Sequence, residues 1–448
     1  MALKTRIKST VINTLASAGY QKFRQRRARL GRTLAGKPPV IHYFHQVDDP
    51  HSQLAVQVLS RLQAAYRTEI LFHLVSAPAA EFQGDASRYM AWTEKDASLI
   101  AVGYGLRLPP RSQFTAGQIN HANNVIAAHA GLADIENKAA DVSLKLRTGQ
   151  LPEDAGLDPT TAKAIAAGNQ MRQRLGHYQS AMFWFDGEWY WGVDRIRVLE
   201  ARLQAEGFSK KPGTTVVPEP TPAPADNLQA SHVQLEYFPS LRSPYTAIGH
   251  RRVLDLADRS GVNLIIRPVM PMMMRGVSAP FPKQHYIITD AAREARFRQV
   301  PFGNIVDPIG EPVRKAFALY PGAVKLNKGS EFVTAYLEAA WARGININST
   351  QGLQTVAAMA GIDWHALTEA AADEDWEALL DENITAMLNH GLWGVPSFRV
   401  TGGIDQTPFA CWGQDRIWRV EEEIVRRAGS LQETLRLSVS HVPDPQDQ

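Results

Sequence analysis

Hydrophobic positions along the chain follow two patterns, and both occur in each half of the sequence. Short apolar runs, PVIHYF ending at Phe44 and HVQLEYF ending at Phe238, predict a strand at the start of each half. Apolar residues at helical spacing with a closing glycine predict helices, most clearly over residues 331–344, 353–361 and 373–391. The pattern therefore predicts a strand followed by a mainly helical region in both halves.

The two halves also end on nearly the same phrase. YWGVDRI occupies residues 190–196 and CWGQDRI occupies residues 411–417. A turn and a strand precede each phrase, over residues 176–185 and 391–400, and a closing helix follows it. A strand, a helical insertion, a strand hairpin and a terminal helix make the order of a thioredoxin-like domain. We therefore predict an α/β protein with two tandem thioredoxin-like domains, each with an inserted helical subdomain.

A proline-rich segment separates the halves, with five prolines between Pro212 and Pro224. Proline at this density resists helix and sheet, so a semi-rigid extended linker is expected there. A chain of 448 residues also exceeds the ~250–300 residues that one core usually supports. The predicted parts are a basic extension over 1–37, a domain over 38–208, the linker over 209–230, a domain over 231–438 and a tail over 439–448.

Composition narrows the class of protein. Hydrophobic residues at 44% and charged residues at 21% are typical of a globular chain. Cys411 is the one cysteine, so neither an intrachain disulfide nor a Cys-x-x-Cys redox pair can form. No apolar run approaches the ~18 residues that a transmembrane helix needs, and a cytoplasmic protein is expected.

The net charge of +3 conceals a local asymmetry, because residues 1–37 carry ten lysines and arginines and no acidic residue. Four apolar residues in this segment lie at roughly helical spacing, namely Val11, Ile12, Leu15 and Phe23. Three interpretations stay open: a solvated amphipathic helix, a helix lying on an anionic membrane surface, or a targeting peptide. Binding to nucleic acid is not predicted.

Each first strand is followed, at the same distance, by a residue pair that suits a helix start. The pair is Asp49-Pro50 in the first half and Ser243-Pro244 in the second. Ser and Asp are common helix N-caps and Pro is favoured at the first helical position, so both pairs have a structural interpretation. A helix N-terminus also stabilises an anion such as a thiolate, which gives Ser243 a functional interpretation. The pattern alone does not choose between them.

Val395-Pro396 lies directly before a predicted strand. Either the bond is cis and exposes the backbone of Val395 to a peptide-like ligand, or it is an ordinary trans bond at a strand edge. The first half has Ala181 at the matching position and lacks this option. In the CWGQDRI phrase, Gln414 and Asp415 either build the turn and cap the helix or hold the charged end of a small ligand.

Motifs for other chemistry are absent from the sequence. It contains no His-Glu-x-x-His pattern, no Cys and His set with zinc-ligand spacing and no glycine-rich phosphate loop. No metal site is therefore predicted.

Three segments of the second half, YFPSLRSPYTAIG, GLWGVPSFRV and CWGQDRIWRVEE, together resemble the DsbA-like thioredoxin family. Within it they are most similar to the 2-hydroxychromene-2-carboxylate isomerases and the kappa-class glutathione transferases. The resemblance spans about residues 233–427, and residues 38–208 resemble the family much more faintly. It implies a glutathione-dependent isomerase acting on a small aromatic or conjugated acid. A kappa-like glutathione transferase and a DsbA-type oxidoreductase are the alternatives within the family.

The resemblance also implies roles for single residues. Ser243 takes the place of the family's redox cysteine, and its hydroxyl is expected to stabilise the thiolate of glutathione. Val395, before the family's cis-proline, is expected to pair through its backbone with the cysteinyl part of glutathione. The other residues implied to contact glutathione are Pro244, Tyr245, Pro396, Gln414 and Asp415. Arg242 either attracts an acidic substrate or is merely solvated.

The first half carries Asp49 and Ala181 at the positions of Ser243 and Pro396. A carboxylate where the thiolate should form disfavours that thiolate, because like charges repel. We therefore expect a degenerate copy, which could replace the second subunit of a homodimer by internal pairing. A further alternative is a non-catalytic scaffold whose two thioredoxin-like domains bind a partner and have no affinity for glutathione.

Overall fold

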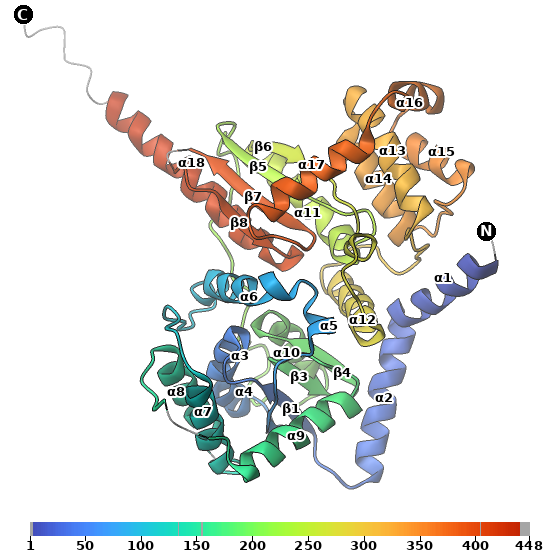
Figure 1. Ribbon diagram of the computed structural model, residues 1–448. Coiled ribbons are helices and arrows are strands. Elements are labelled where there is room, and N and C mark those ends of the chain that lie inside the picture. The colour runs from blue at the N-terminus through green and yellow to red at the C-terminus, as the bar shows by residue number, and fades with distance from the viewer. Residues whose placement is uncertain (1–2, 133, 154–155, 404, 440–448) are drawn as a thin grey trace, which may run out of the picture. The chain divides into compact units, whose positions relative to one another are not determined.

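The computed structural model describes residues 3–132, 134–153, 156–403 and 405–439 (Figure 1). Contacts divide the chain into two compact units. The N-terminal unit comprises Ser17–Pro220 with Ser278–Asp290, and the C-terminal unit comprises Met1–Ala16, Thr221–Val277 and Ala291–Gln448. This division differs from the continuous ranges expected from the sequence, because each unit includes one segment from the other half of the chain.

Each unit contains one four-stranded sheet with the same strand order. In the N-terminal unit the order is β2-β1-β3-β4, made of β1 (Val40–His45), β2 (Glu69–Leu74), β3 (Met182–Phe185) and β4 (Glu188–Trp191). In the C-terminal unit it is β6-β5-β7-β8, made of β5 (Val233–Phe238), β6 (Asn263–Ile266), β7 (Ser397–Gly402) and β8 (Phe409–Trp412). The first two strands pair in parallel, and the last two join as an antiparallel hairpin. This arrangement is thioredoxin-like, and the predicted fold class with two tandem domains is confirmed.

The two sheets correspond closely where the third strand begins. Gly192 N donates to Ala181 O at 2.8 Å in the N-terminal unit, and Gly413 N donates to Pro396 O at 2.9 Å in the C-terminal unit. The strand registers agree with this correspondence. Ala181 therefore occupies the place that Pro396 has in the other unit. A common family origin for the first half stays a prediction.

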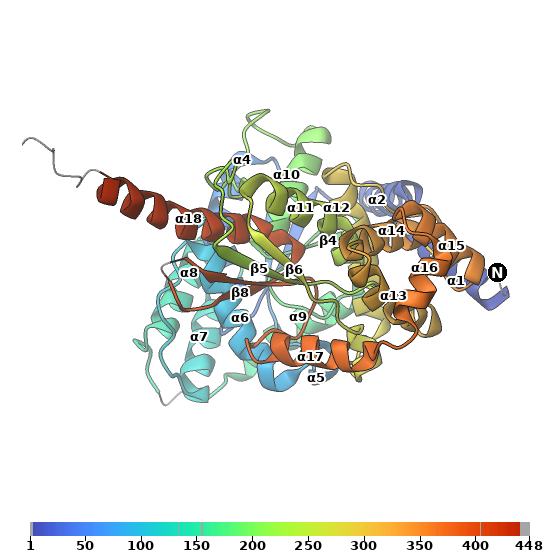
Figure 2. The same cartoon turned by 90° about the horizontal axis from the view of Figure 1, so that it is seen from above.

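In both units most helices lie, along the chain, between the two parallel strands and the hairpin, as the hydrophobic pattern predicted. The helices of the N-terminal unit are α2 (Ala18–Leu34), α3 (Pro50–Ala55), α4 (Leu59–Ala65), α5 (Ala80–Gln83), α6 (Ala86–Ala101), α7 (Ala116–Ala128), α8 (Ile135–Arg147), α9 (Pro159–Arg174) and α10 (Ile196–Ala205). Those of the C-terminal unit are α1 (Leu3–Ala16), α11 (Pro244–Ser260), α13 (Glu311–Lys325), α14 (Gly329–Trp341), α15 (Thr350–Met359), α16 (Trp364–Ala371), α17 (Trp376–Leu388) and α18 (Ile417–Val439). The three helices expected in the second half are confirmed as α14, α15 and α17, and Figures 1 and 2 show α13 to α16 gathered into one cluster.

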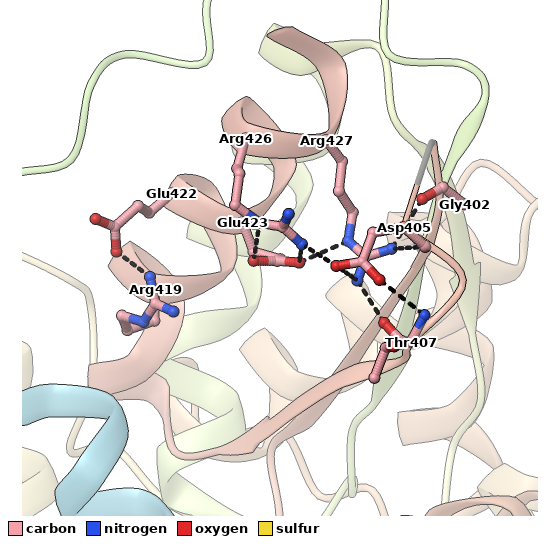
Figure 3. A network of polar contacts seen from close by, with 8 residues as sticks. All are labelled: Gly402, Asp405, Thr407, Arg419, Glu422, Glu423, Arg426 and Arg427. Atoms are coloured by element: carbon pink, nitrogen blue, oxygen red, sulfur yellow. Dashed lines mark hydrogen bonds and ion pairs between the residues drawn. The ribbon is translucent and has the colours of Figure 1, made fainter. Parts of the chain in front are cut away.

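The closing helix α18 is held to the β7–β8 hairpin by a polar network (Figure 3). The side chain of Arg427 is only 1% exposed, and its Nε donates to Glu423 Oε1 at 2.6 Å. Its two Nη atoms donate to the carbonyl oxygens of Gly402, Asp405 and Thr407 at 2.6–2.8 Å. One buried guanidinium thus fixes the connection between the two strands that lead into the CWGQDRI phrase.

The helix at the start of the chain, α1, packs on the C-terminal unit. Lys8 Nζ lies 2.8 Å from Asp307 Oδ2, and Asn13 Oδ1 accepts a hydrogen bond from Ile305 N at 2.7 Å. These two contacts explain why the first residues of the chain belong to this unit. None of the helices in the described residues is long and apolar enough to cross a membrane.

The proline-rich linker is extended, but backbone amides along it are bonded to the protein. Glu200 of α10 accepts hydrogen bonds from Val216 N at 2.7 Å and Val217 N at 2.9 Å. Further along, Ala225 N donates to Glu421 of α18 at 3.2 Å. Each half of the linker is thereby attached to the unit that it adjoins in the sequence.

The division between the units falls inside α12 (Phe281–Phe297), directly after Asp290. The side chain of Asp290 is fully buried, and its carboxylate accepts hydrogen bonds of 2.9–3.1 Å from the guanidinium of Arg195. One turn earlier, the ring of Tyr286 packs edge-on against His177 with 4.8 Å between ring centroids. These contacts explain why a piece of the second half belongs to the N-terminal unit.

Candidate functional site

The candidate site lies at the start of α11 in the C-terminal unit. Ser243 is the N-cap of this helix with extended backbone angles, and its Oγ accepts a hydrogen bond from Thr246 N at 3.1 Å. Pro244 follows at the first helical position, where its missing N–H costs nothing. The structural interpretation of the Ser-Pro pair is therefore confirmed. Its functional interpretation depends on what surrounds the hydroxyl.

The Val395–Pro396 peptide bond is cis, which was one of the two alternatives for this pair. Val395 O lies 3.5 Å from Ser243 Oγ, so the segment before β7 meets the start of α11. At this distance the hydroxyl makes only a marginal hydrogen bond, because strong O–H···O bonds measure about 2.7–2.8 Å. Within the part of the chain that the structure describes, Val395 N makes no backbone hydrogen bond.

The turn after β8 brings Asp415 to the same region. Gly413 N bonds to Pro396 O at 2.9 Å, which joins the CWGQDRI phrase to the cis-proline. Gly413 has φ +125°, and a Cβ at this position would overlap Asp415 Oδ1, so the carboxylate folds back over the glycine. The Asp415 side chain is 14% exposed, and its Oδ1 lies 3.5 Å from Arg416 Nη1. Gly413 is thus bonded to the cis-proline, and the Asp415 carboxylate lies next to this glycine.

Gln414 is buried against the middle of α11. Its Oε1 accepts a hydrogen bond from Arg252 Nη1 at 3.0 Å, and its Nε2 donates to Glu294 Oε2 at 3.4 Å. A Cβ at Gly249 would come within 2.9 Å of the Gln414 Cβ, so the helix approaches this residue closely. Both polar groups of the amide are engaged by protein groups, and its role toward a ligand stays a prediction.

Tyr245 lies one residue inside α11 and is partly exposed. Its ring packs against the cluster of Ile248, Ala291 and Ala295, which joins α11 to α12. The structure therefore brings Ser243, Val395 and Pro396 together. Tyr245 lies in the first turn of the same helix.

Sequence reasoning missed a charged cluster next to Ser243. Arg242 Nε donates to Asp307 Oδ1 at 3.2 Å, and Lys8 of α1 lies on the other carboxylate oxygen. Burial raises the pKa of Asp307, but the charges of Arg242 and Lys8 outweigh burial and lower this pKa below its ordinary value. Arg242 is therefore paired rather than merely solvated. The local sequence carried no signal for this cluster, because its members come from three distant segments.

Arg275 is a second residue that the sequence did not reveal. Its Nε donates to Met270 O at 3.1 Å, and its Nη2 donates to Trp393 O at 2.9 Å. Burial lowers the pKa of Arg275 to about 10. The guanidinium thus supports the segment that leads to Val395.

The corresponding place in the N-terminal unit is filled by a carboxylate. Asp49 is the N-cap of α3, and its Oδ2 accepts hydrogen bonds from Ser52 N at 2.8 Å and Ser52 Oγ at 2.7 Å. Ser180 Oγ donates to the same oxygen at 3.1 Å. Asp49 is therefore satisfied by three donors from the protein itself, and its negative charge lies where a thiolate would have to form.

No group of three or more His, Cys, Asp or Glu side chains that could hold a metal ion occurs among the described residues. Cys411 lies on β8, is buried, and is not at the start of a helix. The position at the start of α11 has a serine hydroxyl instead.

The segment before the cis-proline permits one stability prediction. A Cβ at Gly394 would overlap the indole ring of Trp412. We expect Gly394→Ala to lower the free energy of unfolding by about 1–3 kcal/mol, because the ring has to move. Urea unfolding measures this change. Gly429→Ala is the control, since nothing lies within 4 Å of a Cβ there, and an unchanged midpoint for both variants would contradict the prediction.

Comparison with known proteins gives a family match for most of the C-terminal half of the chain. Residues 234–425 match the family model of the DSBA-like thioredoxin domain. No curated protein matches the chain.

Solved structures give matches that each cover a little under half of the chain. A 2-hydroxychromene-2-carboxylate isomerase is 17% identical over 45% of this chain and 98% of its own, with a TM-score of 0.37. The cytosolic disulfide reductase DsbM from Pseudomonas aeruginosa is 17% identical over 46% of this chain and 99% of its own, with a TM-score of 0.35. A structure of DsbM with GSH is 15% identical over 45% and 99%, with a TM-score of 0.33. At these identities the matches carry no conclusion about activity.

Proposed function

We propose that the C-terminal unit, whose residues 234–425 are a DSBA-like thioredoxin domain, is a glutathione-dependent isomerase. The proposed reaction is of the 2-hydroxychromene-2-carboxylate isomerase type, on an aromatic or conjugated acid. A cytoplasmic location, where thiols are kept reduced, fits this proposal. The N-terminal unit is proposed to stand in for a second subunit.

One observation carries the proposal: the hydroxyl of Ser243 at the start of α11. Its oxygen is fixed by Thr246 N at 3.1 Å, whereas the acceptor for its hydrogen among the described residues is Val395 O at the long distance of 3.5 Å. A hydroxyl held in this way can turn its proton to a nearby anion at little cost. The helix N-terminus adds a partial positive charge at the same point. Both effects favour a thiolate next to Ser243.

Glutathione would supply the thiolate that adds reversibly to the conjugated double bond of the substrate. The chain's own residues would bind and orient the tripeptide. Val395 offers a backbone amide that no described backbone group uses, and it lies beside Ser243. Asp415 is proposed to hold the ammonium group of the γ-glutamyl end, since its carboxylate lies beside Gly413, whose N–H bonds to the cis-proline. Pro244, Tyr245, Pro396 and Gln414 are proposed to complete the site.

The charged cluster beside Ser243 supports an acidic substrate. Lys8 and Arg242 share the single carboxylate of Asp307, so the cluster has an excess of positive charge. The Lys8 side chain is 50% exposed and can face a ligand in solution. Net positive charge at the edge of a site raises the local concentration of a carboxylate substrate.

Three other functions are less well supported. A DsbA-type oxidoreductase exchanges disulfides through its own cysteine at the start of the helix, where this chain has Ser243, and its one cysteine is buried on β8. A kappa-like transferase would use the same thiolate but release a conjugate. A non-catalytic scaffold needs no hydroxyl at this position and no affinity for glutathione.

Calorimetric titration with reduced glutathione tests the proposal. We expect the intact protein to bind glutathione and to bind S-methylglutathione more weakly, because the methylated sulfur cannot become a thiolate. Assays with chromene carboxylates then separate isomerisation from conjugation. Absence of glutathione binding by the intact, reduced protein would remove both the isomerase and the transferase.

A further inference from the structure

The helix α2 has one face fixed to the N-terminal unit. Arg32 donates to both carboxylate oxygens of Asp186 at 3.0–3.1 Å. Gln21 and Gln25 each donate to Glu188 at 2.8 Å. All three donors lie on one side of the helix, and both acceptors belong to the β3–β4 hairpin.

The backbone of α2 lies directly on the turn of this hairpin. Gly187 has φ +88°, and a Cβ there would come within 2.8 Å of Arg24 O and 3.4 Å of the Ala28 Cβ. This close approach and the hydrogen bonds leave α2 no freedom to rotate about its axis. Its opposite side therefore has to face away from the hairpin.

The outer face of α2, defined by Phe23, Leu30 and Leu34, is strongly apolar. These side chains are 57%, 59% and 79% exposed. They lie seven and four residues apart, which aligns them in one stripe along the helix. Three large apolar side chains in one exposed stripe are uncommon on a soluble protein and mark a surface that binds something.

Positive charge surrounds the outer face. Four exposed basic side chains flank it, namely Lys22, Arg26, Arg27 and Arg29. No acidic residue occurs anywhere in residues 1–37, so the partner's surface has to be negatively charged to complement this helix.

We infer that the outer face of α2 binds the surface of an anionic membrane. The apolar stripe would enter the boundary between headgroups and acyl chains, and the arginines would pair with lipid phosphates. Nucleic acid also attracts arginines, but a phosphate backbone gains little from Phe23, Leu30 and Leu34. The combination of both features on one helix face favours lipid. This inference is independent of the proposed glutathione chemistry.

Vesicle binding by the full-length chain tests the inference. Vesicles of equal parts phosphatidylcholine and phosphatidylserine are compared with vesicles of phosphatidylcholine alone, at low and high salt. The anionic vesicles should sediment with the protein, and salt should weaken the association. The variant Phe23→Ser/Leu30→Ser/Leu34→Ser should bind at least about tenfold more weakly, because the apolar burial is lost. Removing three charges with Arg26→Gln/Arg27→Gln/Arg29→Gln should weaken binding roughly a hundredfold.

Matched controls use exposed residues elsewhere. Val102 is 84% exposed and Leu132 is 53% exposed, so Val102→Ser/Leu132→Ser removes apolar surface of a similar kind without affecting α2. Unchanged vesicle binding is expected for this control. No association of the unaltered chain with anionic vesicles at low salt would overturn the inference. The inference would also be overturned if only the arginine variant lost vesicle binding and the unaltered chain bound a DNA duplex tightly. A third contrary result would be a dimer of the unaltered chain that the apolar variant does not form.

Discussion

Ser243→Ala is expected to lower kcat/KM for glutathione-dependent isomerisation roughly 10²- to 10³-fold, the usual effect of removing one donor that stabilises a developing anion. The hydroxyl is a side-chain donor at the start of α11, and its acceptor within the described part of the chain is Val395 O, 3.5 Å away. Without this donor the thiol of glutathione keeps an ordinary thiol pKa of about 8.5. The remaining activity should therefore rise toward alkaline pH. A pH profile of kcat/KM measures both the loss and the shift.

The N-terminal unit provides a matched control for this variant. Asp49 caps α3 as Ser243 caps α11, with its carboxylate on Ser52 N at 2.8 Å. Both Asp49→Ala and Ser243→Ala should lose about 1 kcal/mol of stability, because each removes an N-cap. Only Ser243→Ala should lose turnover. Equal turnover in both variants and the wild-type protein would show that Ser243 is a helix cap and nothing more.

The local parts of the site could be predicted from the sequence. A Ser-Pro pair after a strand predicts a helix start wherever it occurs, because the N-cap preference and the fixed φ of proline depend on neighbouring residues only. The same reasoning applies to Asp49-Pro50, and both pairs begin helices in the structure. The position of Val395-Pro396 before β7 also follows from local order.

The charged groups around the site could not be predicted in this way. Arg242 and Asp307 lie 65 residues apart in the chain, and Lys8 comes from α1, which has to pack on the C-terminal unit to reach Asp307. Arg275 is similar, because its partner Trp393 O lies more than one hundred residues away. For Gln414 the sequence left two alternatives, a turn-building residue or a ligand contact. Its amide bonds to Arg252 and Glu294 in the structure, and the ligand contact stays a prediction.

The domain boundaries drawn from the sequence were continuous, whereas each unit of the structure also contains one segment from the other half of the chain. A proline-rich linker and a repeated phrase mark the ends of two halves, but neither indicates that a single helix such as α12 has residues in both units. The contact that joins this part of α12 to the N-terminal unit is made by Asp290, a buried carboxylate whose partner is the arginine of the YWGVDRI phrase.

Asp290→Ala is expected to destabilise the N-terminal unit by about 3–5 kcal/mol, because it removes one partner of a buried ion pair with Arg195. The two side chains are 0% and 4% exposed, so water cannot replace the lost partner. Urea unfolding measures the loss, and Asp141→Ala is the control, since its pair with Lys145 is nearly half exposed and should contribute at most about 1 kcal/mol.

Hydrogen exchange locates the effect of Asp290→Ala within the chain. Protection should fall first in β3, β4 and α10, although the substituted residue lies in the second half of the sequence, because Arg195 directly precedes α10. The double variant Arg195→Met/Asp290→Leu should recover most of the stability, since an apolar pair of similar volume needs no counter-charge. A loss of protection confined to β5 through β8 would contradict the assignment of residues 278–290 to the N-terminal unit. Under that outcome, Arg195 would stabilise the N-terminal unit independently of residues 278–290.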